Sequence, residues 1–202
     1  MNDGSYPVHI EAARPTESSR AWALLFVLFG LKAFALIVHL IVLLFYGIAA
    51  AFVLFVSQLV VLFTGRYPEG MHAFVRRVVG QGVKVNAWLY GLTDVFPPFA
   101  PGENDYPVKL TIEYPQSSSR GWALATILFF VKALALIPHA AVLYVLELAM
   151  GIVVWVANVI VLFTGEFPDG MRSFAVSVLQ WQVRVSASSL GLRDEYPPFS
   201  MT

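Results

Sequence analysis

The chain has no cysteine, few charged residues and no net charge. The absence of cysteine excludes disulfides, thiolate metal sites and cysteine nucleophiles. Only 13% of the 202 residues are charged, about half the share found in soluble domains. The 13 basic residues balance the 13 acidic ones, so nothing favours nucleic acid as a partner. The N-terminus is polar, and we expect no cleavable signal peptide there.

Apolar residues are what the chain has in excess. They make up 58% of it, and the mean hydropathy is +0.70. Two nearly uncharged runs, 22–63 and 122–163, are each about 42 residues long, which is roughly 63 Å of helix. A bilayer core is about 30 Å thick and needs about 20 residues to cross. Each run therefore predicts two crossings, and the chain predicts an all-α integral membrane protein.

The two runs belong to an internal repeat with a period of 100 residues and no gaps. The element Ser18-Ser19-Arg20 returns at 118–120, and Pro97-Pro98-Phe99 returns at 197–199. Such self-similarity indicates tandem duplication. We expect a first repeat over 1–100 and a second over 101–202, packed about a pseudo-two-fold axis along the membrane normal.

Each repeat is expected to contain a short strand, a transmembrane helical hairpin and an amphipathic interfacial helix. These are placed at 6–14, 20–64 and 70–92 in the first repeat, and at 106–114, 120–164 and 170–192 in the second. The strands are expected to pair with each other or with a neighbouring chain, or else to form irregular arms. The hairpin turns are expected near Tyr46-Gly47 and near Glu147, and Pro138 predicts a break or kink.

Basic residues outside the apolar runs set the expected topology. With two crossings per run, all of them lie on one side, and the positive-inside rule makes that side the cytoplasm. Both termini are then cytoplasmic. The third helix of each repeat has an apolar stripe and a basic face, which is typical of a helix in the membrane surface. Its membrane-surface basic residues are Arg76, Arg77, Lys84 and Arg184.

Four ionisable residues inside the apolar runs are the candidate site: Lys32, His39, Lys132 and His139. A charged group in a membrane is costly and is a functional candidate by default. The four groups converging at the pseudo-two-fold axis would form an ion or proton path, a lipid headgroup site or a histidine pair. In the structural interpretation, which we favour, the first helix is tilted or half-inserted and Lys32 reaches the interface. We do not expect haem or metal at His39 and His139.

Other polar residues predict packing rather than chemistry. Gln58 and Asn158 occupy matching positions in the apolar runs, where amides usually bond to a neighbouring helix. Asp94 and Asp194 lie beside proline turns. The sequence contains no recognisable nucleophile–base pair, metal-ligand cluster or phosphate-binding loop, so we expect no enzyme and no cofactor.

Several motifs occur twice, namely Y-P-V, S-S-R-x-W-A-L, V-L-F-T-G-x-x-P-x-G-M and D-x-x-P-P-F. Through them the chain resembles a family of bacterial membrane proteins known only as domain of unknown function 4389. The resemblance covers nearly the whole chain and implies a bacterial membrane protein. Together with two crossings per apolar run, it leads us to expect a multi-pass protein of the inner membrane. It implies no activity, substrate or catalytic residue.

The expected function is that of a non-enzymatic membrane protein. It would be a scaffold or accessory subunit of a membrane assembly, or it would shape the membrane by wedging. Its expected partners are membrane lipids and other membrane proteins or further copies of itself, and not nucleic acid. The alternative is a small carrier or channel for an ion, a proton or a lipid that uses the four Lys and His residues.

Overall fold

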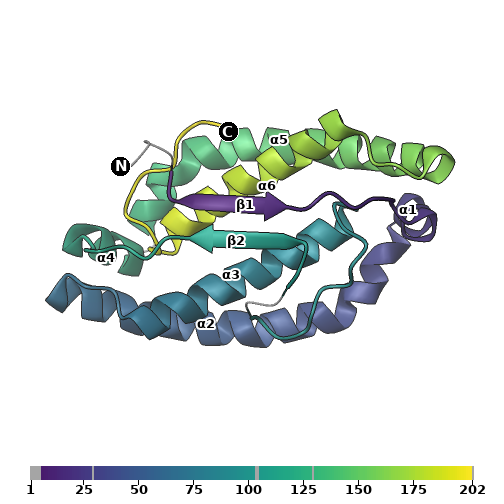
Figure 1. Cartoon of the computed structure of the whole chain (residues 1–202). Coiled ribbons are helices and arrows are strands. Elements are labelled where there is room, and N and C mark those ends of the chain that lie inside the picture. Colours follow the sequence, from purple (N-terminus) through teal and green to yellow (C-terminus); the bar gives the residue numbers. More distant parts are fainter. Residues whose placement is uncertain (1–5, 29, 103–104, 129, 202) are drawn as a thin grey trace.

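The computed structural model describes residues 6–28, 30–102, 105–128 and 130–201. The chain is mostly helical, and the same order of strand, short helix, long helix and third helix occurs twice (Figure 1). The elements of the first repeat are β1 (Val8–Ala12), α1 (Arg20–Val27), the 3-10 helix η1 (Leu31–Leu36), α2 (Ile37–Thr64) and α3 (Glu69–Leu89). Those of the second repeat are β2 (Val108–Ile112), α4 (Arg120–Ile127), α5 (Phe130–Thr164) and α6 (Asp169–Ser189).

The two strands pair with each other, which confirms the first of the pairings expected from the sequence. They run antiparallel, with Ile10 opposite Leu110 and Glu11 opposite Lys109. Side chains alternate between the two faces of a strand, and Val8 and Val108 are buried whereas Glu11 and Lys109 point away from the core. The sheet therefore ties the starts of the two repeats together.

The prediction of a turn in the middle of each apolar run is wrong. The helix α2 continues unbroken through Tyr46-Gly47, and α5 continues through Pro138 and Glu147. The break lies earlier, where α1 ends and Gly30 takes a left-handed conformation with φ 71°. A lone glycine costs a helix only about 1 kcal/mol, so Gly47 does not interrupt a helix that packs against α3 and α4.

The two long helices run in opposite directions (Figure 1). Gly65 ends α2 in a left-handed conformation, and α3 then returns along α2. The start of each short helix lies beside the end of the other repeat's long helix. The backbone N–H of Ser18 donates to Gly165 at 2.9 Å, and that of Ser118 donates to Gly65 at 3.0 Å. The pseudo-two-fold axis is therefore perpendicular to the long helices.

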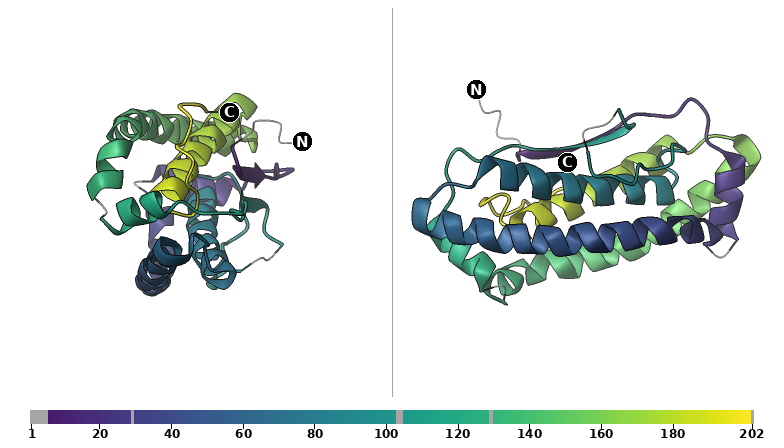
Figure 2. Two further views of the ribbon diagram at one scale, coloured as in Figure 1. Left: turned by 90° about the vertical axis from the view of Figure 1, so that its left-hand side faces the viewer. Right: turned by 90° about the horizontal axis from the view of Figure 1, so that it is seen from below.

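The molecule has three layers (Figure 2). The sheet forms the first layer, α3 and α6 form the second, and α2 and α5 form the third. Two segments of the third layer, Leu31–Thr64 and Leu134–Thr164, are long and apolar enough to cross a membrane. Few of their residues are buried inside the protein, so this layer presents a broad apolar surface.

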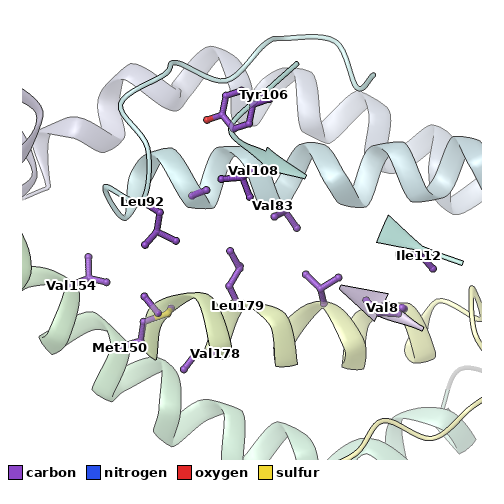
Figure 3. Packing of buried hydrophobic residues seen from close by; sticks show 14 of the residues in the cluster. Val8, Val83, Leu92, Tyr106, Val108, Ile112, Met150, Val154, Val178 and Leu179 are labelled. Carbon is purple, nitrogen blue, oxygen red and sulfur yellow. The ribbon is translucent and has the colours of Figure 1, made fainter. Parts of the chain in front are cut away.

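The core lies on both sides of the third helices, against the sheet and against the long helices, and is shared by the two repeats (Figure 3). Leu92, Val108 and Leu179 are fully buried there, next to Met150 of α5. The helices α3 and α6 are therefore enclosed between two layers. This differs from the expected interfacial helices, whose polar faces would lie open to water.

Candidate functional site

Lys32, a candidate from the sequence, is buried within the first repeat. Its Nζ donates a hydrogen bond to the backbone carbonyl of Trp88 at 2.5 Å and lies 4.4 Å from the centre of that indole ring. Only 1% of the residue is exposed. Trp22 packs edge-on against the same ring. A carbonyl oxygen and an aromatic face both stabilise a buried ammonium group, so Lys32 fastens η1 to the end of α3.

His39 lies under the closing tail of the same repeat. Its Nε2 is 2.8 Å from the carbonyl oxygen of Pro97, and its ring stacks on Phe99 with 4.2 Å between the centroids. Phe96 meets the ring edge-on. The two prolines hold the tail extended, so that its carbonyl and its aromatic ring both reach the histidine.

The second repeat builds the same arrangement from partly different residues. Lys132 donates to the hydroxyl of Thr126 at 3.0 Å instead of to a tryptophan carbonyl. His139 stacks on Phe199 with 3.8 Å between the centroids, and its Nδ1 accepts a hydrogen bond from the indole of Trp181. Matching positions therefore keep their structural role although their partners have changed.

The aspartate of each tail holds the start of a short helix. Asp94 accepts a hydrogen bond from the backbone N–H of Ser19 at 2.7 Å, and Asp194 accepts one from Ser119 at 2.5 Å. Burial raises the pKa of Asp194, although this hydrogen bond and the charge of Lys132 act in the opposite direction. We call the lysine, histidine, aspartate and terminal phenylalanine of each repeat the tail lock.

The structure does not bring the four Lys and His residues together. The hydrogen bonds of Lys32 and His39 stay within the first repeat, and those of Lys132 and His139 stay within the second. Four grooves on the described surface are lined by other residues. The four residues therefore form two separate tail locks rather than one site at the pseudo-two-fold axis.

The two amides of the long helices connect the repeats. Gln58 donates to the carbonyl of Gly191 at 3.5 Å, and Asn158 donates to that of Tyr90 at 3.4 Å. Each amide therefore reaches the end of the other repeat's third helix, in the helix-packing role that the sequence predicts.

Two further residues at this interface were not singled out from the sequence. His72 lies 3.3 Å from the carbonyl oxygen of Leu192, and Arg172 donates to that of Leu92 at 2.6 Å. They occupy matching positions, one period apart. Burial lowers the pKa of His72 to about 4, since the charged form would lose its hydration. The period of 100 residues matches these two positions. Because one carries His and the other Arg, the sequence does not show that they share a role.

The basic residues predicted for the membrane surface divide into two groups. Arg76 and Arg77 lie on the outer surface of α3, whereas Lys84 and Arg184 are buried, which corrects the prediction for these two. Lys84 donates to the carbonyl of Gly102 at 2.8 Å, and Arg184 donates to that of Val8 at 3.5 Å. Their long side chains therefore point inward and donate to backbone carbonyls of their own surroundings.

Within the residues that the structure describes, no group of three or more His, Asp or Glu residues is placed to hold a metal ion. The ring of His39 is enclosed by aromatic side chains of its own tail.

The fold and the paired tail locks define a class: a mostly helical tandem-repeat protein with two helices apolar enough to cross a membrane. The chain belongs to the family described as domain of unknown function (DUF4389), whose model matches residues 23–100 and again residues 127–201. The resemblance seen in the repeated motifs is thereby confirmed, as is the tandem arrangement. The chain matches no curated protein and no solved structure.

Proposed function

We propose that the protein is a non-enzymatic membrane scaffold that inserts the layer of α2 and α5 into one leaflet and shapes the membrane by wedging. The observation that carries this proposal is the exposed surface of that layer. Large apolar side chains stand out from it along its length, among them Phe34, Phe45, Phe52, Leu134 and Ile152. An exposed apolar patch of this extent marks a membrane or protein contact.

Insertion from one side fits the layered fold better than a crossing. The sheet, α3 and α6 all run alongside the long helices (Figure 1), so a crossing would carry them into the bilayer as well. Glu11 and Lys109 would then lie in hydrocarbon, together with the outer edges of the two strands. Charges and open sheet edges are both costly there.

The short helices supply the route into the leaflet. Each has 8 residues, about 12 Å of helix, and α1 leads from the sheet layer towards the apolar layer (Figure 2). Ser19 caps its start, and Trp22 follows in the first turn, where the headgroup region favours tryptophan. The long helix then lies in the leaflet rather than across it.

This placement retains part of the expected topology. The pseudo-two-fold axis is perpendicular to the layers and runs along the membrane normal. The basic residues outside the apolar runs then face one side, which the positive-inside rule makes the cytoplasmic face of a bacterial inner membrane.

The wedging role is tested by reconstitution. The purified protein, incorporated into phosphatidylethanolamine–phosphatidylglycerol vesicles at rising density, should narrow them or draw out tubules visible by electron cryomicroscopy. A variant with a weakened apolar face, Phe45→Ser with Phe52→Ser, should deform vesicles less at equal protein density. The conservative pair Phe45→Leu with Phe52→Leu should act like the wild type. Unchanged vesicles at every density would contradict the role.

A further inference from the structure

A groove between α3 and β2 belongs neither to the tail locks nor to the apolar face. It has a volume of about 410 Å³. The helix side is formed by Arg76, Arg77, Gly80 and Lys84, and the strand side by residues 108–111. It lies on the side of the molecule that carries the sheet, away from the layer of α2 and α5.

The groove gathers positive charge. Of its described lining residues, Arg76, Arg77, Lys84 and Lys109 are cationic, and Asp105 is anionic. Asp105 lies 3.4 Å from Lys109, but both side chains are largely exposed. An exposed pair of this kind contributes little, so an incoming anion can replace the carboxylate at Lys109.

At the matching place in the second repeat, a side chain lies between α6 and β1. Gly80 corresponds to Gln180, whose amide donates to Val8 and accepts from the backbone N–H of Ile10. That side chain fills the space and joins α6 to β1 through these two hydrogen bonds. In the first repeat a Cβ at Gly80 would meet Leu110 at an ordinary contact distance of 3.9 Å, and the glycine, which has no longer side chain, lines the groove.

The two arginines are also confined to the first repeat. Val176 and Ser177 stand at the positions of Arg76 and Arg77. Two changes therefore coincide in one repeat: the filling side chain is absent, and two arginines stand beside the opening. Packing of the fold requires neither change, because the second repeat forms the same elements without them.

We propose that this groove binds a phosphate group, carried either by a soluble phosphate ester or by the headgroup of an anionic lipid. Guanidinium groups match phosphate oxygens through paired hydrogen bonds. Lys84 sits at the base of the groove and Lys109 at its rim, so a bound phosphate meets cations from both the helix and the strand. Binding of a soluble ester does not depend on how the apolar layer meets the membrane, whereas the headgroup alternative rests on a placement that brings lipid phosphates to the groove.

The full-length protein in phosphatidylcholine nanodiscs allows a direct test. Glycerol 3-phosphate is titrated by calorimetry, and phosphatidic acid is tested by incorporation into the nanodisc and detection of the bound lipid by native mass spectrometry. Binding of both probes identifies a site for a free phosphate ester, and binding of phosphatidic acid alone identifies a headgroup site.

Two variants introduce into the first repeat the residues that the second repeat has at the matching positions. Arg76→Val with Arg77→Ser removes charge, and Gly80→Gln fills the groove without changing charge. Each is expected to weaken binding by about tenfold or more. The control Arg14→Val with Arg66→Ser removes the same charge from exposed positions elsewhere and should leave binding unchanged. The proposal is overturned if neither probe binds the wild type, if binding survives both groove variants, or if the control loses as much.

Discussion

Gln58 of α2 lies against Gly191, which follows the C-cap residue of α6 and takes a left-handed conformation. Its Nε2 is 2.8 Å from the point that a Cβ on Gly191 would occupy, and φ of the glycine is +68°. The same contact occurs in the opposite direction, where Asn158 lies 3.2 Å from the Cβ position of Gly91. The two amides therefore lock the repeats together at the ends of α3 and α6.

Replacing Gly191 by alanine tests this lock. The new Cβ would press on Gln58 and would also hold an L-residue at positive φ, so we expect a loss of stability of about 1–3 kcal/mol. Thermal unfolding in detergent measures it. Gly170→Ala is the control, because nothing lies within 4 Å of its Cβ position. Equal stability of the two variants would mean that the contact is not close-packed.

Removing the carboxylate of the first tail lock tests the role of the D-x-x-P-P-F motif. Asp94→Ala leaves the backbone N–H of Ser19 without its acceptor and should cost about 1–3 kcal/mol. Asp94→Asn keeps an acceptor oxygen and should cost less. Unfolding and limited proteolysis of the tail provide the two measurements. Glu166→Ala, at an exposed position, should change neither.

His72 makes stability depend on pH. Its pKa falls from 6.5 to about 4 on folding because burial penalises the charged form. Above pH 6.5 the residue is neutral in both states and carries no penalty. As the pH falls towards 4, His72 becomes protonated in the unfolded chain but stays neutral in the folded chain. The free energy of unfolding therefore drops by up to about 3 kcal/mol.

The variant His72→Gln isolates this contribution. It keeps a donor for the Leu192 carbonyl and does not titrate, so the difference between variant and wild type should grow in the variant's favour below pH 6.5. Unfolding measured between pH 8 and pH 4 shows the difference. If the stability of the wild type and that of the variant changed with pH in parallel, His72 would be ruled out as the cause.

The repeat, the strands and the third helices could be predicted because each leaves a local pattern. The period of 100 residues is visible without gaps, and the alternation from Val108 to Ile112 is that of a strand. Proline and glycine after Thr64 and Thr164 correctly marked the ends of the long helices. Gln58 and Asn158 were recognisable as packing residues because amides in apolar runs need partners.

The path of the apolar runs could not be predicted because their composition is uniform. Neither Gly47 nor Pro138 breaks its helix, whereas Gly30 does so through a left-handed conformation. Where each helix turns depends on contacts with the other repeat, such as that between Ser18 and Gly165. For the same reason the sequence did not show that Lys32 lies in η1 and His39 in α2, or that their partners are Trp88 and Pro97.

We expect the apolar layer of α2 and α5 to enter the membrane from one side. The chain has no cysteine, so single cysteines at Glu17 and Arg66 can be labelled without a background. These positions lie at opposite ends of the long helices (Figure 1). In sealed inverted vesicles, a membrane-impermeant maleimide should label both, and in sealed vesicles of the original orientation it should label neither. Labelling of one position in each orientation would show that the helices cross the bilayer, and would contradict insertion from one side.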